Sequence, residues 1–128
     1  MKMALDNPSG VNAIRRYDAG RVQIREHYYT SSLIVLPEEL ITGWEARSSD
    51  QLRAAHLEPI LARRPEVLIL GTGEAQVFPD PAIFTALMDL GVGFEVMDNA
   101  AACRTYNVLL AEDRRAALAL MLGGDAAE

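Results

Sequence analysis

The chain contains a single cysteine and no long apolar run. Cys103 has no second thiol to pair with among the 128 residues, and a lone thiol is typical of a reducing compartment. The longest uninterrupted apolar run, "AALALML" at 116–122, is much shorter than the ~18 residues that a membrane-spanning helix needs. The opening "MKMALDNPSG" also lacks the apolar stretch of a signal peptide. We therefore expect a cytoplasmic protein that does not insert directly into a membrane.

Basic residues and clustered metal ligands are scarce as well. Lysine and arginine together number 12 against 18 aspartates and glutamates, which gives a net charge of −6. The overall field therefore repels phosphate backbones, and nucleic acid is not an expected partner. His27 and His56 stand alone in the sequence, and no group of His, Cys, Asp and Glu has the spacing of a metal site. The sequence predicts neither a metal site nor another cofactor.

The residues that are present are typical of one packed domain. Half of them are hydrophobic and 23% are charged, which argues against a largely disordered chain. A length of 128 residues corresponds to about one domain. Turn-forming residues dominate the beginning of the chain. We predict a flexible leader over 1–12, a single α/β domain over 13–122 and a flexible tail over 123–128.

Short strands are predicted first. From residue 14 to about residue 46, apolar stretches alternate with turn residues such as "DAG" and "PEE". Val22 and Ile24 alternate with polar residues as in a half-buried strand, whereas the continuous "LIVL" at 33–36 indicates a more buried one. We expect three or four short antiparallel strands in this part of the chain.

The second half alternates between helices and strands. Ser48 or Ser49 is expected to cap a helix through "DQLRAAHLEPIL", where apolar residues recur at helical spacing. "EVLILG" is a continuous apolar run of the kind found in a strand covered on both faces. "GFEVMD" predicts the next strand, and the helix after it has Asp98 or Asn99 as its cap.

The helix between these two strands completes a βαβ unit. It is predicted to begin at Asp80 or Pro81 and to end at Gly91. Its buried stripe is predicted to consist of Ile83, Leu87 and Leu90. A βαβ crossover leaves its two strands parallel, so "GTG" at 71–73 and "DNAAACR" at 98–104 should lie close together. Open α/β sheets usually bind ligands at that edge.

The segment Gly71, Thr72 and Gly73 can be interpreted in two ways. Glycine allows close backbone approach, so the segment could cradle a phosphate or simply turn the chain. A dinucleotide-binding fingerprint would have a third glycine or alanine where this chain has Gln76. The Gly-Lys-Ser/Thr ending of a P-loop is absent too. The sequence therefore gives only weak support for a nucleotide site.

Cys103 and Arg104 are the other candidates for chemistry. Both lie near a predicted helix start, where the helix dipole and the guanidinium favour a thiolate. Free cysteine is also one of the most commonly buried residues, and neither histidine is close in sequence to act as a base. Arg104 either pairs with Asp98 or Glu95 or recognises a carboxylate or phosphate. Asn107 either satisfies loop backbone groups or takes part in the same recognition.

Three quoted stretches resemble one family. They are "PEVLILGTG" at 65–73, "GVGFEVMD" at 91–98 and "ACRTYNVLLAEDRR" at 102–115. They resemble the Mth-type uncharacterised-domain family, which includes the mitochondrial complex I assembly factor 3 and the adipogenesis-associated Mth domain proteins. The resemblance covers roughly residues 14–122 and implies a three-layer α/β domain around a central mixed sheet. It also implies that 116–122 forms an antiparallel strand inside that sheet.

The resemblance also selects candidate site residues. The positions that match the family are Gly71, Thr72, Gly73, Asp98, Cys103, Arg104, Thr105 and Asn107. At position 99 this chain has asparagine where threonine is more typical of the family, and both residues can cap a helix. The expected fold is a single α/β domain in which antiparallel strands precede the βαβ unit and a last antiparallel strand.

The resemblance implies binding rather than catalysis. The better-studied eukaryotic members look like assembly factors that bind other proteins, so we expect a non-enzymatic protein-binding module from a bacterium, with an unidentified protein partner. The alternative is a domain that binds a small molecule or anion. In that case the 71–73 edge and Arg104 would hold the anion, and Cys103 would act on it as an enzyme nucleophile.

Overall fold

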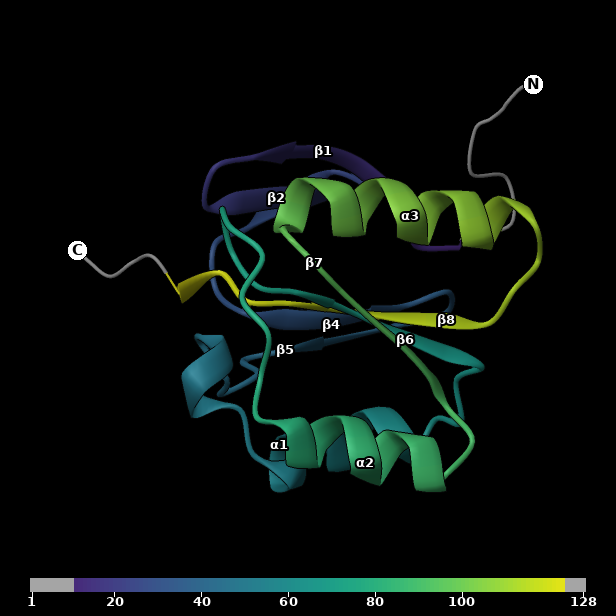
Figure 1. Cartoon of the computed structure of the whole chain (residues 1–128). Coiled ribbons are helices and arrows are strands. Elements are labelled where there is room, and N and C mark those ends of the chain that lie inside the picture. The colour runs from purple at the N-terminus through teal and green to yellow at the C-terminus, as the bar shows by residue number, and fades with distance from the viewer. Residues whose placement is uncertain (1–10, 124–128) are drawn as a thin grey trace.

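The computed structural model describes residues 11–123 (Figure 1). In chain order, its elements are β1 (Ile14–Asp18), β2 (Arg21–Ile24), β3 (His27–Tyr29), β4 (Leu33–Leu36), β5 (Glu39–Thr42), the 3-10 turn η1 (Ser49–Gln51), α1 (Ala54–Leu61), β6 (Val67–Gly71), α2 (Pro81–Asp89), β7 (Gly93–Met97), α3 (Asn99–Ala111) and β8 (Ala116–Leu120). Most of the predicted leader and tail lies outside the described residues.

A mixed sheet of five strands forms the middle layer. Its order is β5-β4-β8-β6-β7. The predicted βαβ unit is confirmed as β6-α2-β7, whose strands are parallel. The strand predicted inside the sheet at 116–122 is confirmed as β8. It runs antiparallel to β4 and parallel to β6. The pairing of neighbouring strands therefore changes from antiparallel to parallel at β8.

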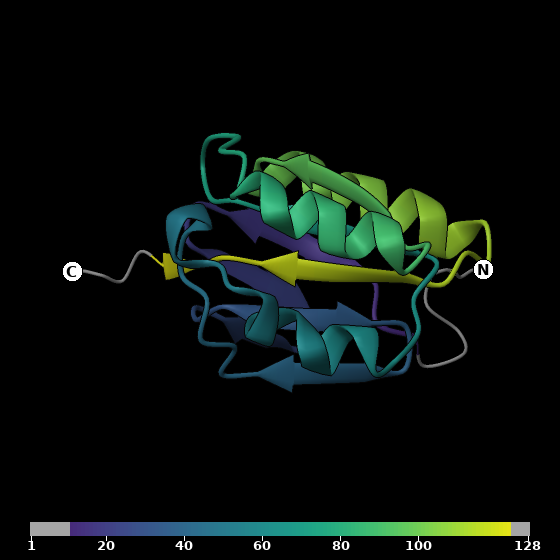
Figure 2. The ribbon, with the colours of Figure 1, turned by 60° about the horizontal axis from the view of Figure 1, so that its bottom comes forward.

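The other elements cover both faces of this sheet. Figure 1 shows α3 and the β1-β2 hairpin above the sheet, with α1 and α2 below it. Strands β1, β2 and β3 form a separate antiparallel sheet. Figure 2 gives a second view of the same layers. The expected three-layer α/β fold with a central mixed sheet is confirmed.

Two apolar cores separate these layers. Leu68 and Leu70 of β6 belong to the core beneath α1 and α2. Ile69, which lies between them, belongs to the core beneath α3, together with Tyr106. Successive strand residues point to opposite faces, so a strand covered on both sides has no polar alternation. This explains the continuous apolar runs of β6 and β8.

The region before residue 46 contains five strands rather than the three or four that we predicted. Two-residue turns divide it, at Ala19–Gly20 between β1 and β2 and at Arg25–Glu26 between β2 and β3. The second turn has no glycine, and Arg25 itself takes the left-handed conformation, with φ of 56°. Because Arg-Glu is not a usual turn pair, this hairpin could not be predicted from the sequence.

Two helix predictions were wrong in part. The helix expected from Ser48 or Ser49 is interrupted, because Leu52 has extended backbone between η1 and α1. The Ser48 side chain does not cap a helix; its hydroxyl donates to Asp50 instead. In α2, Ile83 and Leu87 are buried as predicted, but Leu90 is 60% exposed. Leu90 is the C-cap, just beyond the last helical residue, Asp89.

Candidate functional site

The carboxyl ends of β6 and β7 lie side by side, as the βαβ unit requires. The Thr72 N–H donates to the Met97 carbonyl at 2.9 Å, and the Asn99 N–H donates to the Gly73 carbonyl at 2.8 Å. The two polar segments that the sequence assigned to one edge are therefore joined by backbone hydrogen bonds.

The glycines of "GTG" serve packing and a turn. A Cβ on Gly71 would collide with Asn99 Oδ1 and lie 2.7 Å from Leu120 Cδ2. Gly73 has φ of +102°, which other residues rarely adopt. The Gly73 N–H donates to Asn99 Oδ1 at 3.0 Å. The amides of Thr72 and Gly73 are both occupied within the protein, so neither has a free N–H for a phosphate.

Asn99 is the centre of this edge. Its side chain is only 1% exposed, and its Nδ2 donates to the Met121 carbonyl at 3.0 Å and to the Tyr17 hydroxyl at 3.2 Å. The Tyr17 hydroxyl in turn donates to the Glu74 carboxylate. Burial, and then the hydrogen bond to Glu74, raise the pKa of Tyr17 to about 12. Tyr17 is therefore neutral at physiological pH and cannot act as a base.

Two further candidates at this edge have structural partners. Asp98 is the N-cap of α3, and its Oδ1 accepts the Ala101 N–H at 2.9 Å. The Thr72 hydroxyl donates to the Ala75 carbonyl at 2.6 Å and so fixes the loop after β6. The sequence predicted Asp98 or Asn99 as the cap of α3. Asp98 is the N-cap, and Asn99 is the first residue of the helix.

Cys103 and Arg104 differ sharply in exposure. Cys103 is 4% exposed, and burial raises its pKa to about 12, although the charge of Arg104 opposes that shift. This is the reverse of what a thiolate nucleophile needs. Arg104 is exposed, and within residues 11–123 it forms no ion pair. The predicted bridge from Arg104 to Asp98 or Glu95 is therefore not found.

Asn107 and Thr105 connect α3 to neighbouring strands. Asn107 accepts the Ile14 N–H and donates to the Ile14 carbonyl, both at 2.9 Å. Its backbone-bridging role is thus found, although its partner is strand β1 rather than a loop. Thr105 donates to the Met97 sulfur at 3.3 Å.

The eight candidates do not form one site. Four lie at the edge of the sheet: Gly71, Thr72, Gly73 and Asp98. Three others line a separate groove against β1: Cys103, Arg104 and Asn107. The eighth, Thr105, contacts Met97 at the end of β7. The combination needed by the enzyme alternative, with Cys103 and Arg104 acting at the 71–73 edge, is therefore not assembled in this arrangement.

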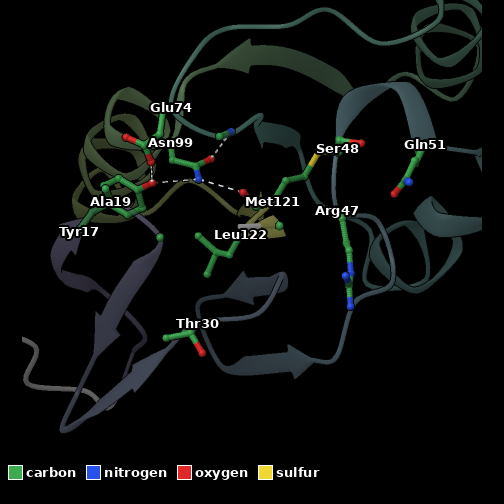
Figure 3. Close-up of a pocket in the computed structure, with 13 residues that line it drawn as sticks. Tyr17, Ala19, Thr30, Arg47, Ser48, Gln51, Glu74, Asn99, Met121 and Leu122 are labelled. Atoms are coloured by element: carbon green, nitrogen blue, oxygen red, sulfur yellow. Dashed lines mark hydrogen bonds between the residues drawn. The ribbon is translucent and has the colours of Figure 1, made fainter. Parts of the chain in front are cut away.

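A larger cleft lies beside the edge (Figure 3). It encloses about 760 Å³, within the ~300–1,000 Å³ range of small-molecule sites. Tyr17, Glu74 and Asn99 form one side, and Arg47 and Gln51 lie across from them. These groups can hold a polar ligand, but the described residues that line the cleft include no histidine or cysteine.

Sequence reasoning missed most of this cleft. Tyr17, Glu74 and Arg47 lie in turns and a hairpin with no motif, and nothing in their spacing connects them. The position of Asn99, directly after a predicted strand, indicated only that it could cap the following helix. In the part of the chain that the structure describes, no group of three or more His, Cys, Asp and Glu could hold a metal ion.

Replacing Gly71 should destabilise the protein more than replacing a neighbouring strand glycine. Gly71→Ala forces a methyl group against Asn99 and Leu120, and overpacking of this kind costs about 1–3 kcal/mol. Gly93→Ala is the matched control, because its added Cβ would meet Val67 at an ordinary 3.4 Å. Urea unfolding of both variants measures the difference. Equal stability of the two variants would contradict the packing role of Gly71.

Cys103 should be unreactive in the folded protein. Its pKa is raised from 9.0 to about 12, so iodoacetamide at pH 8 should alkylate it more slowly than a model peptide thiol and at the model rate in urea. Between pH 9 and pH 12 the folded state keeps the thiol proton that the unfolded state loses. The contribution of Cys103 to the free energy of unfolding is therefore complete below pH 9 and declines as the pH rises toward 12. Alkylation at pH 6 faster than the peptide would instead support a thiolate.

Solved structures with the same fold come from several bacteria. A Xanthomonas campestris protein is 42% identical, with a TM-score of 0.83, covering 97% of this chain and 94% of that one. A Bordetella pertussis protein, described as a Mth938-like domain, is 28% identical with a TM-score of 0.80 and coverage of 97% and 94%. The resemblance to the Mth-type family is thereby confirmed.

Two curated relatives differ in what their names say. The NADH dehydrogenase [ubiquinone] 1 alpha subcomplex assembly factor 3 of Xenopus tropicalis is 36% identical over 89 residues, 68% of this chain. This chain spans only 48% of that relative's length. The 13 kDa major membrane protein of Francisella tularensis is 31% identical over 101 residues, with coverage of 78% and 82%. Within residues 11–123, no helix is long and apolar enough to cross a membrane.

A family model covers most of the chain as well. The family model for a protein of unknown function (DUF498/DUF598) matches residues 14–121, which is nearly the whole described domain. The chain belongs to the DUF498/DUF598 family, whose relatives include Mth938-like domains and complex I assembly factors.

Proposed function

We propose that this chain is a non-enzymatic protein-binding module. The observation that carries the proposal is an exposed apolar surface beside α2. We call it the α2 surface, and it consists of Val77, Phe78, Phe84, Met88 and Phe94. Phe78 is 63% exposed, Met88 72% and Val77 48%. Exposed apolar groups gathered in this way are typical of interaction sites.

Aromatic contacts make the α2 surface continuous. The ring centroids of Phe78 and Phe84 are 6.3 Å apart, and those of Phe84 and Phe94 are 4.8 Å apart. Met88 follows Phe84 by one helical turn and so lies on the same side of α2. The row therefore runs from the loop before α2, across the helix, to strand β7. A groove of about 700 Å³ adjoins it between residues 49–54 and 77–83.

Strand β7 adds backbone groups to this surface. It is an edge strand of the five-stranded sheet, and its only neighbour in that sheet is β6. Gly93 and Met97 direct their backbone groups at the β6 side, since the Gly93 N–H donates to Glu66 and the Met97 carbonyl accepts from Thr72. Residues between them at alternate positions, such as Phe94, direct theirs outward. Gln76 covers part of this edge by donating to the Val96 carbonyl at 2.9 Å.

The charges around the surface indicate what kind of partner fits it. Asp80 and Asp89 are exposed in the loop before α2 and in the helix itself. A partner with an apolar patch bordered by basic residues would complement this arrangement. The name of the Xenopus relative supports a role in assembling other proteins, and we extend that role to this chain, in the cytoplasm of a bacterium.

The polar groups give less support to catalysis. Cys103 is buried and protonated, and Tyr17 and Asn99 are committed to hydrogen bonds within the protein. The second candidate function is binding of a small polar ligand, and the cleft of about 760 Å³ beside Asn99 favours it. The described residues that line the cleft include no histidine and no cysteine, and binding without turnover is the simpler role for it.

Affinity capture with matched surface variants tests the protein-binding proposal. The tagged protein is captured from gently lysed cells of its own source, and co-purifying proteins are identified by mass spectrometry. Phe78→Asp combined with Met88→Asp should reduce recovery of a few reproducible partners at least about tenfold, because a buried aromatic anchor carries ~2 kcal/mol or more. Both residues are exposed, so the variant should stay folded, which circular dichroism checks.

Val108→Asp is the matched control. Val108 is an apolar residue of similar exposure, at 56%, but it lies on α3 across the sheet (Figure 1). Partners should be retained in this control. Loss of the same partners in Arg104→Ala but not in the α2 variant would place the binding surface among the α3 residues that the sequence selected. An empty capture with all variants would count against the binding module and favour the small-ligand candidate.

A further inference from the structure

A small groove between β1 and α3 gathers three arginines. It encloses about 240 Å³ and is lined by Arg15, Arg16 and Arg104, together with Ala100, Cys103 and Asn107 among others. It is separate from the α2 surface and lies on the opposite face of the sheet, where α3 and β1 pack (Figure 1). The groove plays no part in the function proposed above.

An irregularity in β1 explains how two consecutive arginines line one groove. Neighbouring strand residues normally point to opposite faces. In the β1-β2 pairing, Ile14 is opposite Ile24 and Arg16 is opposite Gln23. Arg15 is therefore an extra residue, and such bulges redirect side chains. The two hydrogen bonds between the Asn107 side chain and the Ile14 backbone, each 2.9 Å, fix the strand against α3 just before this bulge.

The three guanidinium groups are not neutralised by acidic residues of the described chain. All three arginines are exposed. The ion pairs found within residues 11–123 use other arginines, namely Arg21, Arg63, Arg114 and Arg115. Among the described residues that line the groove there is no aspartate or glutamate. Arg15 donates to the Arg25 carbonyl at 3.5 Å, but this bond does not neutralise its charge. Gathering three cations that form no ion pair within residues 11–123 creates local repulsion that a bound anion would relieve.

We propose that this groove binds a phosphoryl group, either as free phosphate or as part of a phosphomonoester. Guanidinium groups donate paired hydrogen bonds to phosphate oxygens, and several of them suit a dianion better than a single carboxylate. The volume is below the ~300 Å³ of a typical small-molecule site, so it suits a compact group. The buried Cys103 thiol adds no negative charge that would repel the anion.

A phosphomonoester has room to extend from the groove. Tyr17 lines both this groove and the larger cleft beside Asn99. A ligand with its phosphate among the arginines would therefore direct its organic part past Tyr17. Free phosphate and a phosphomonoester share the same chemistry at the arginines and differ only in this second contact.

Titration followed by amide NMR tests the site. Labelled protein is titrated with inorganic phosphate at constant ionic strength, with sodium chloride as the balancing salt. The amides of Arg15, Arg16, Ala100 and Arg104 should shift together and saturate. The double variant Arg16→Ala with Arg104→Ala should weaken binding at least about tenfold, a loss of ~1.4 kcal/mol. Its amide spectrum without phosphate reports whether it remains folded.

Arg114→Ala is the charge-matched control. Arg114 is exposed and pairs with Glu66 outside the groove, so its removal should leave phosphate binding unchanged. Phosphoserine as a second probe separates the two sources. Tighter binding than phosphate supports an organic ligand, and equal binding supports phosphate itself. Shifts that do not saturate, that sodium acetate reproduces in full, or that survive in the double variant would overturn the proposal.

Discussion

The side-chain amide of Asn99 is the contact on which the arrangement of this edge depends. Its oxygen accepts the N–H of Gly73 after β6, and its nitrogen donates to the carbonyl of Met121 after β8 and to the hydroxyl of Tyr17 in β1. One buried group therefore joins the ends of three strands at the start of α3. Gly71 must lack a side chain because the amide occupies that space. Since a buried amide left without partners is costly, the strand ends and the helix start hold one another in place.

This network uses the donors and acceptors of the edge residues to hold the chain together. The cysteine nearest to them is buried. The two binding surfaces proposed above lie elsewhere, on opposite faces of the sheet. The α2 surface offers apolar contact and an open strand edge, whereas the arginine groove offers positive charge. A domain with this division is suited to binding, because its rigid centre holds two different surfaces in fixed positions.

The sequence predicted the parts of the fold that follow from local pattern. The continuous apolar run at 67–71 identified a strand covered on both faces, and the βαβ unit correctly brought residues 71–73 next to the start of α3. The apolar run at 116–120 is compatible with a helix as well, and only the family resemblance predicted the strand found there. It did not reveal the role of Asn99, because its side-chain partners lie 22, 26 and 82 positions away. Nor did it place Arg15 and Arg16 in one groove, since that depends on a bulge set by strand pairing.

The most direct test of this account is the free energy of unfolding of Asn99→Ala, measured in urea. The substitution removes the partner of the Gly73 N–H and of the Met121 carbonyl, and each buried group left unsatisfied costs about 1–3 kcal/mol. If Asn99 holds the strand ends together, its removal should lower the free energy of unfolding by about 2–4 kcal/mol. Hydrogen exchange at the Gly73 amide should also become faster. A loss below ~0.5 kcal/mol, as for an ordinary surface substitution, with unchanged exchange, would contradict it.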